Sequence, residues 1–402
     1  MRKRVFILFL AIVGCNSTAR QQSVVSNDGL VMEMGTVNLG AAPGVIRLAT
    51  PRISAIAEEV SKMREMDVLC FEELWTQEYK DAVIKALGPE MHVFYVDTRG
   101  ENQRDGVNVC SPSQAEKAIS CARDKCGDWP AEEQTICVVE QCSDKLFKIL
   151  LKGGFECLHC LVASVGMSVD GIVNACVQPN DQTPIAGMSR AFGGQNGGLL
   201  ASRRPLMNVE ALRLRASFSN RVALFATIDV EGYESIELVC AHISTTTPLL
   251  PNHPDFSTWD EEMIAQIEDV SKRLKQRAGN RPSVFLGDMN AGPAIGKEIA
   301  EEAPMVWKRI VELGFSSSAI EVASPAFCTM CKDNTLSGKS SSSTIIDHIL
   351  VRDPSGGTQL EPVSAYPFFD KIRKFAGYDG EQVEKHLSDH CGVVVNFRLR
   401  KN

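Results

Sequence analysis

The chemical signal in this sequence is a set of acidic, amide and imidazole side chains at the ends of short apolar runs. Carboxylates and amide oxygens are ligands that hard divalent cations prefer, and an imidazole with a reference pKa of about 6.5 can accept a proton near neutral pH. Each residue taken singly is more often a turn, cap or packing residue, so the set carries more weight than any member. The segments are Phe71-Glu72-Glu73-Leu74, Cys240-Ala241-His242, Leu286-Gly287-Asp288-Met289-Asn290, Ile345-Ile346-Asp347-His348 and Leu387-Ser388-Asp389-His390.

Alternating strand-like and amphipathic stretches must bring these side chains together. Apolar spacing predicts a helix over residues 51–64 and a buried strand over 67–71. Thr258 and Glu261 have the layout of a capping box, which predicts the start of a second helix. Because the strand-like runs outnumber those of one helix-flanked sheet, we expect two packed sheets with helices outside them. The remaining runs lie at 92–96, 198–202, 222–230, 236–242, 284–287, 345–351 and 392–398.

Composition indicates a folded globular protein. Hydrophobic residues make up 44% and charged residues 23% of the 402 residues, which excludes disordered, collagen-like and coiled-coil classes. The formal net charge is −8. An acidic chain repels polyphosphates at long range, so the charge argues against a protein that binds nucleic acid through a basic surface.

The first 22 residues are expected to be a signal peptide and a linker. Three basic residues precede a nine-residue apolar run that is too short to span a bilayer, which is typical of a secretory signal. The run ends in Ile12-Val13-Gly14-Cys15, which resembles a bacterial lipobox, so lipidation of Cys15 and simple cleavage near Ala19 both stay open. We therefore expect a secreted protein, with a lipid anchor to a bacterial envelope as one form.

Fourteen cysteines favour an oxidising compartment. Eight of them lie between residues 110 and 176, and we expect this segment to be a cysteine-rich, helical insertion that divides a catalytic domain into residues 30–109 and 177–402. Two C-x4-C pairs within it suit a helical hairpin with nested bridges, Cys121 to Cys142 and Cys126 to Cys137, although spacing does not select among the connectivities. The ten disulfide candidates are Cys110, Cys121, Cys126, Cys137, Cys142, Cys157, Cys160, Cys176, Cys328 and Cys331.

The other cysteine patterns are interpreted separately. Cys157-Leu158-His159-Cys160 could bind zinc, but a structural disulfide is favoured because thiolate ligands would compete with oxidation. The C-x2-C pair Cys328 and Cys331 is expected to close a local loop. Cys70, Cys240 and Cys391 lie in apolar runs, where buried free thiols are expected.

Read in order, the polar segments resemble the endonuclease/exonuclease/phosphatase superfamily. The resemblance runs from about Met32 to Arg398, interrupted by the cysteine-rich segment. It implies a four-layer α/β/β/α sandwich of two mixed sheets with a divalent metal site at one edge. The matching segments are Thr36-Val37-Asn38, residues 67–75, residues 197–203, Ala241-His242, Gly287-Asp288-Met289-Asn290, Ile346-Asp347-His348 and Ser388-Asp389-His390.

The resemblance also implies a metal site. Glu73 is similar to the metal-binding glutamate, Asn38 to the asparagine beside the metal, and Asp389 to a ligand or orienting residue. Mg²⁺ is the expected ion, with Mn²⁺ or Ca²⁺ as alternatives. Family members usually have Gln-Glu where this chain has Glu72-Glu73, so Glu72 either joins the metal shell or, as we favour, only adds negative charge nearby.

The catalytic roles follow from the same resemblance. His390 corresponds to the general base, and Asp347 to the carboxylate that fixes the tautomer of its ring. Asp288 and Asn290 are expected to position water and the scissile phosphate, and His242 to donate to a phosphate oxygen or to assist the leaving group.

The substrate class is less determined than the reaction. The amino-acid sequence of residues 67–75 resembles the corresponding segment of neutral sphingomyelinases, so sphingomyelin is the favoured substrate. The alternatives are a secreted nuclease, a phosphatase of the same superfamily and a non-enzymatic adhesion or toxin-like module.

Aromatic and basic residues over 366–378 could contact a membrane surface or simply pack inside. We expect a monomer.

Overall fold

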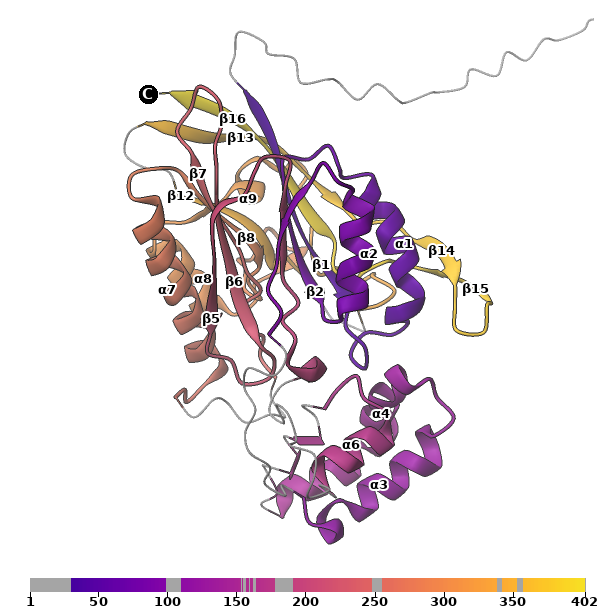
Figure 1. The fold of residues 1–402 in the computed structure, drawn as a ribbon. Helices are drawn as coiled ribbons and strands as arrows, with labels where there is room; N and C mark the ends of the chain where they lie inside the picture. Colours follow the sequence, from indigo (N-terminus) through magenta and orange to yellow (C-terminus); the bar gives the residue numbers. More distant parts are fainter. Residues whose placement is uncertain are drawn as a thin grey trace, which may run out of the picture.

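The computed structural model describes residues 30–98, 110–152, 154, 157–158, 160–161, 164–177, 191–247, 255–337, 342–352 and 357–401. Two six-stranded mixed sheets pack face to face, and helices cover their outer faces (Figure 1). The predicted four-layer α/β/β/α sandwich is therefore confirmed. The leader with Cys15 lies outside the described residues. Among the residues described, no helix is both long and apolar enough to cross a membrane.

The first sheet has the spatial order β13, β16, β1, β2, β4, β3. Only β1 and β2 are parallel neighbours in it, and the other pairs are antiparallel. Consequently β1 and β2 end at the same edge of the sheet, where β16 begins. The strands are β1 Val31–Ala41, β2 Val68–Leu74, β3 His92–Phe94, β4 Leu199–Ser202, β13 Thr358–Phe368 and β16 Gly392–Lys401.

The second sheet has the order β10, β12, β8, β7, β6, β5. Here β7 and β8 are parallel, and β12 runs antiparallel to β8. Its strands are β5 Met207–Leu214, β6 Arg221–Ile228, β7 Ile236–Cys240, β8 Ser283–Asp288, β10 Ser316–Ser317 and β12 Asp347–Arg352. Two small sheets pair β9 Ile299–Ala300 with β11 Ser343–Thr344, and β14 Arg373–Ala376 with β15 Gln382–Lys385.

Helices cover the outer faces because each presents an apolar stripe. On the first sheet lie α1 Ala49–Ser61 and α2 Gln77–Leu87, and on the second α7 Trp259–Ala278 and α8 Pro304–Glu312. Thr258 caps α7 by accepting a hydrogen bond from the Glu261 backbone N–H, as the capping pattern predicted. The short α9 Ser318–Val322 packs against β13. The main apolar core lies between the two sheets.

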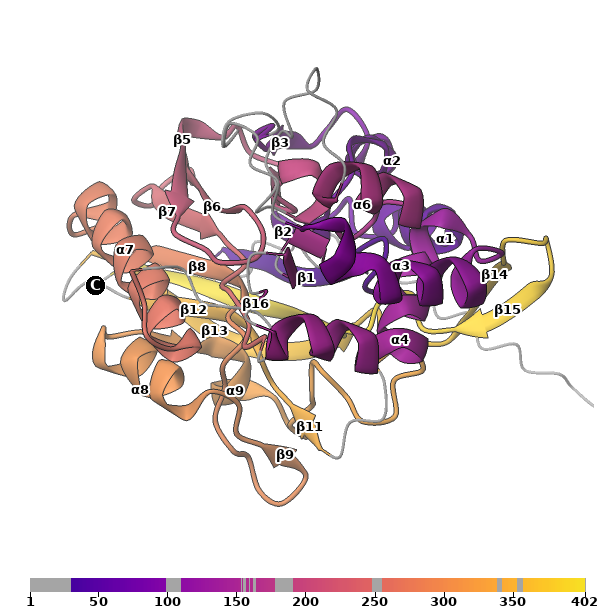
Figure 2. The same ribbon diagram turned by 90° about the horizontal axis from the view of Figure 1, so that it is seen from below.

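The cysteine-rich segment forms a separate cluster of helices, α3 Pro112–Cys126, η1 Ala131–Glu133, α4 Gln134–Leu151 and α6 Val169–Cys176. A further short helix, η2 Ala191–Gly194, precedes β4. The cluster lies below the edge where β1 and β2 end (Figures 1 and 2). Glu133 accepts a hydrogen bond from the Leu48 backbone N–H at 2.7 Å, and Arg47 pairs with Glu140 at 2.7 Å. The insertion is thus anchored at the start of α1.

The disulfides confirm the favoured interpretations of the cysteine-rich segment and of the Cys328 and Cys331 pair. Both nested bonds, Cys121–Cys142 and Cys126–Cys137, are present, and Cys328 is bonded to Cys331. The zinc alternative for Cys157 and Cys160 is wrong, because their sulfur atoms form two separate disulfides, Cys110–Cys157 and Cys160–Cys176.

Cys70 and Cys240, expected as free thiols, are joined to each other. They face one another across the inter-sheet core with a Cα–Cα distance of 5.5 Å, and 170 positions of sequence separate them, so no local pattern could reveal the bond. Cys391 is the buried free thiol that the sequence predicted.

The aromatic segment over 366–378 is partly buried and partly exposed. Phe369 and Phe375 are buried in the core beneath α1 and α2. Tyr366 and Tyr378 are 39% and 37% exposed, and Ile372 is half exposed. The segment therefore contributes core packing with its phenylalanines and surface with its remaining apolar side chains.

Candidate active site

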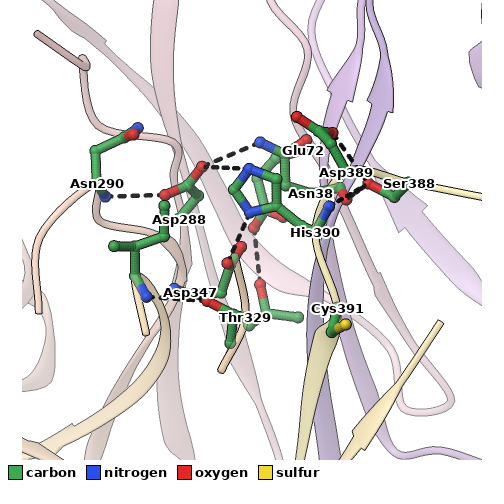
Figure 3. A network of polar contacts seen from close by, with 12 residues as sticks. Asn38, Glu72, Asp288, Asn290, Thr329, Asp347, Ser388, Asp389, His390 and Cys391 are labelled. Carbon is green, nitrogen blue, oxygen red and sulfur yellow. Dashed lines mark hydrogen bonds and ion pairs between the residues drawn. The ribbon is translucent and has the colours of Figure 1, made fainter. Parts of the chain in front are cut away.

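Strand pairing explains why the predicted polar residues meet. Asp347 and Asp288 are direct partners in the antiparallel ladder between β12 and β8. Asn38 is near the end of β1. Residues 388–390 lie just before β16, which is the antiparallel neighbour of β1. All of these positions lie at one edge of the sandwich, and Figure 3 shows their side chains converging there.

His390 and Asp347 form a buried pair. Nδ1 of His390 lies 2.8 Å from Oδ2 of Asp347, which leaves Nε2 directed into the site. Burial opposes the charged form of the ring, but Asp347 and Asp389 outweigh it and raise the pKa of His390 well above its ordinary value. The contact fixes the tautomer of the ring, because the proton on Nδ1 is donated to the carboxylate.

Asp288 is the centre of the remaining polar contacts. Nδ2 of Asn38 donates to its Oδ2 at 3.0 Å, and the Asn290 backbone N–H donates to its Oδ1 at 2.9 Å. Nε2 of His242 is 3.3 Å and Nε2 of His390 4.0 Å from the same Oδ2. Burial, followed by repulsion from Asp347, raises the pKa of Asp288 to about 7. Asp288 is therefore a carboxylate that needs nearby positive charge to ionise fully.

His242 is held neutral beside Asp288. Burial first, and then the charges of Arg221 and His390, lower the pKa of His242 well below its usual value. Its Nε2 also lies 3.2 Å from Nδ2 of Asn290, whose amide donates to the Ile243 carbonyl at 3.0 Å. A neutral imidazole has one N–H. When His242 carries it on Nε2, this N–H can donate to Asp288. The same N–H can donate to a phosphate oxygen when that oxygen takes the place of the carboxylate.

Glu73 and Asp389 place two further carboxyl groups at the same edge. Burial of the Glu73 carboxyl group and the charge of Asp389 raise the pKa of Glu73, although the residue as a whole is partly exposed. Glu73 has a φ of 58°, an uncommon conformation for a residue with a Cβ that is often found at functional sites. Gly197 permits it, since a Cβ at Gly197 would lie 2.9 Å from the backbone of Glu73.

The donor set fits a hard divalent cation. Glu73 and Asp389 repel each other, as Asp288 and Asp347 do, and an ion bound among them would relieve this repulsion. Asp288, Asp347 and His390 also have ligand atoms within 4.8 Å of one another. Nδ1 of His390 and Oδ2 of Asp347 already bind each other, whereas Glu73, Asn38 and Asp389 offer the oxygen ligands that a hard cation prefers.

Glu72 lies where family members usually have glutamine. It is fully buried between the sheets, and Oγ1 of Thr36 donates to its Oε1 at 2.8 Å. Burial and the charge of Asp347 raise its pKa well above the ordinary value, so Glu72 adds less negative charge than expected. Glu72 also groups with Cys70 and Cys240, but these sulfur atoms form a disulfide and are not available as ligands.

Arg221 is a site residue that sequence reasoning missed. It is only 7% exposed, and its guanidinium lies 5.5 Å from the ring centre of Trp75, which stacks on Phe192 at 4.4 Å. Glu73 and Asp288 are its main charged neighbours. Its Nη1 is buried and lacks a hydrogen-bond partner among the residues described. Arg221 therefore presents an unused donor and a positive charge beside the carboxylates.

Thr329 is a second residue that sequence reasoning missed, and it supports the backbone beside the His390–Asp347 pair. Its Oγ1 accepts hydrogen bonds from the backbone N–H groups of Ile346 and Asp347, at 2.9 and 3.1 Å. Its carbonyl accepts from the Cys391 backbone N–H at 2.7 Å. A threonine between two cysteines carries no sequence signal for this role.

Comparison with known proteins identifies the family. Residues 35–390 match the Endonuclease/Exonuclease/phosphatase family, so the chain belongs to this family. Members are generally metal-dependent phosphoric ester hydrolases. No curated protein matches the sequence significantly.

Solved structures show the same fold at low sequence identity. Sphingomyelinase C from Streptomyces griseocarneus has a TM-score of 0.52 and 11% identity, with 91% of this chain and 99% of that chain covered. A beta toxin mutant from Staphylococcus aureus with bound magnesium ions has a TM-score of 0.52 and 10% identity, covering 90% and 98%. A family member from Bacteroides vulgatus has a TM-score of 0.50 and 12% identity, covering 92% and 99%.

Proposed function

We propose that this protein is a divalent-metal-dependent phosphodiesterase that hydrolyses a phospholipid headgroup, with sphingomyelin as the favoured substrate and phosphocholine and ceramide as products. The observation that carries the hydrolase part is the buried His390–Asp347 pair facing Asp288 and Asn38 at one sheet edge. A general base, a carboxylate cluster and unused donors occur there together, which is the combination that water attack on a phosphodiester needs.

The reaction is derived from the residues present. In the neutral form of His390, Nε2 removes a proton from the attacking water, and Asp347 stabilises the imidazolium that forms. Positive charge bound among the nearby carboxylates would lower the raised pKa of His390 and so favour this neutral form. His242 and Arg221 donate to phosphoryl oxygens on which negative charge develops. Asn290 lies beside His242, where its side-chain amide donates to the Ile243 carbonyl. A divalent ion held by Glu73, Asn38 and Asp389 would supply the Lewis acid that polarises the phosphoryl group.

The support for a lipid substrate does not come from the catalytic residues but from the net charge of the chain and from a sequence similarity. The acidic chain does not favour the backbone of a duplex, which attracts basic surfaces. Residues 67–75 are similar to the corresponding neutral sphingomyelinase segment, and a sphingomyelinase C is among the structures with this fold. A secreted nuclease is the alternative that the same catalytic residues would serve.

A paired assay tests the proposal. Sphingomyelin vesicles and supercoiled plasmid are each incubated with the protein and Mg²⁺, with EDTA, and with the His390→Ala variant. Phosphocholine release that requires Mg²⁺ and His390, without plasmid nicking, is the expected result. Plasmid nicking without phosphocholine release would replace the lipid assignment with the nuclease alternative, and inactivity on both would contradict the proposal.

A further inference from the structure

Three cysteine sulfur atoms lie together behind the catalytic pair. Cys328 is bonded to Cys331, and the free thiol of Cys391 has its Sγ 3.9 Å from Sγ of Cys331. Cys391 is the one free thiol among the cysteines that the structure describes. Thiol–disulfide exchange starts from a thiolate beside a disulfide, and burial, which raises the pKa of Cys391, makes this step slow near neutral pH.

A cavity gives reagents access to one end of this arrangement. It has a volume of about 530 Å³, and Cys328, Cys331 and Cys391 are all among its lining residues. Cys391 is 6% exposed, whereas Cys328 is only half-buried. A thiol released at Cys328 would therefore face the cavity, while the thiol of Cys391 is largely covered by protein.

The same loop holds the catalytic residues in place. Thr329, between the two bonded cysteines, accepts a hydrogen bond from the Asp347 backbone (Figure 3), and its carbonyl accepts from the Cys391 backbone N–H. Asn334, just beyond the loop, donates from Nδ2 to the Ser388 carbonyl at 2.9 Å, and Ser388 Oγ accepts from the His390 backbone N–H at 3.1 Å. Movement of the loop would therefore displace both members of the general-base pair.

We propose that the cluster of Cys328, Cys331 and Cys391 is a thiol-exchange site whose pairing controls the hydrolytic site. The Cys391 sulfur attacks Sγ of Cys331, the Cys331–Cys391 bond forms, and the Cys328–Cys331 bond breaks. Cys328 leaves with the bonding electrons and takes a proton in place of the one that Cys391 loses to solvent. The step is an isomerisation and consumes no oxidant or reductant.

The consequence for activity rests on the proposed function. Formation of the Cys331–Cys391 bond would close the 3.9 Å between these sulfur atoms and open the Cys328–Cys331 loop, whose Thr329 holds the backbones of Asp347 and Cys391. We expect this rearrangement to shift Thr329 and Asp347. Displacement of a catalytic group by about 1 Å can lower a rate about 100-fold. We therefore expect the exchanged form to hydrolyse its substrate about 100-fold more slowly.

The exchange is tested by trapping it with N-ethylmaleimide. The folded full chain, carrying Cys15→Ser so that no other thiol reacts, is incubated with the reagent at pH 8 without reductant, quenched with acid and digested with trypsin. The expected products are a maleimide on Cys328 and a disulfide between peptide 310–332 and peptide 386–398. The control adds Cys391→Ser, which should take up no reagent and keep its activity.

Two results would overturn the proposal. One is a maleimide on Cys391 with the Cys328–Cys331 bond intact. The other is no labelling of the folded chain, while the same chain unfolded in denaturant takes up one maleimide. Peptide mapping needs no enzymatic activity, so failure of the exchange and failure of the proposed function give different results. If mapping shows the exchange but the trapped protein hydrolyses substrate as fast as untreated protein, control of the site is refuted.

Discussion

Replacing Arg221 with glutamine tests whether the missed cation acts on the substrate. In the structure this guanidinium is buried, stacks over Trp75 and has an Nη1 without a hydrogen-bond partner in the described residues. If Nη1 donates to a phosphoryl oxygen, the variant loses one hydrogen bond from a charged donor, worth about 1.5–3 kcal/mol. That corresponds to a decrease in kcat/KM of roughly 10- to 150-fold.

The assay is hydrolysis of a small soluble phosphodiester at saturating Mg²⁺, which removes any contribution from membrane binding. Stability should fall by about 2 kcal/mol, because the contact with Trp75 is buried, while no hydrogen bond of Nη1 is broken. The matched control is Arg309→Gln, which removes a surface arginine paired with Glu268 and Glu312 and should leave kcat/KM unchanged.

A second readout separates a direct role from a structural one. The charge of Arg221 contributes to the lowered pKa of His242, so this pKa should rise in Arg221→Gln, as followed by NMR titration of the ring. A folded variant whose kcat/KM falls less than about threefold, a loss of well under 1 kcal/mol, would refute the assignment of Arg221 to the substrate.

Three further predictions concern the metal, the base and the core. Glu73→Gln should raise the Mg²⁺ concentration for half-maximal activity by about 10- to 100-fold, and an unchanged Mg²⁺ titration would remove Glu73 from the metal site. Asp347 raises the pKa of His390, so Asp347→Asn should lower the maximal rate and move the acid limb of the pH–rate profile to lower pH; a shift to higher pH would contradict the pairing. Burial lowers the pKa of His348 to about 4. As the pH is lowered from about 6.5 to 4, the unfolded chain takes up a proton on this residue and the folded chain does not, so the free energy of unfolding decreases by about 3 kcal/mol. Urea unfolding of His348→Asn should lack this decrease.

Much of the site could be predicted because its residues follow strands. Asp288 and Asp347 come from segments whose apolar runs mark β8 and β12, and the antiparallel register then places the two carboxyl groups opposite each other. The strands that frame the sheets were harder to detect. The strand signals did not reveal β1, β5 or β13, since β5 and β13 have one partly exposed face and β1 contains glycine and polar residues.

Long-range pairings were beyond the sequence. Arg221 begins a strand after Ser219 and Asn220, where an arginine is an ordinary surface residue, and only folding places it over Trp75. The Cys70–Cys240 bond joins the two sheets and depends on how they stack. The insertion's contact with the start of α1 depends likewise on tertiary packing rather than on local spacing.

The central claim is that His390 acts as the general base beside a separately held metal ion. The most direct measurement is kcat at saturating Mg²⁺ for His390→Ala, together with Mg²⁺ affinity by calorimetry on the same preparation. Loss of a positioned general base should lower kcat by about 100- to 10,000-fold while Mg²⁺ affinity changes far less. A variant that keeps a kcat within tenfold of the unmodified chain would contradict the account.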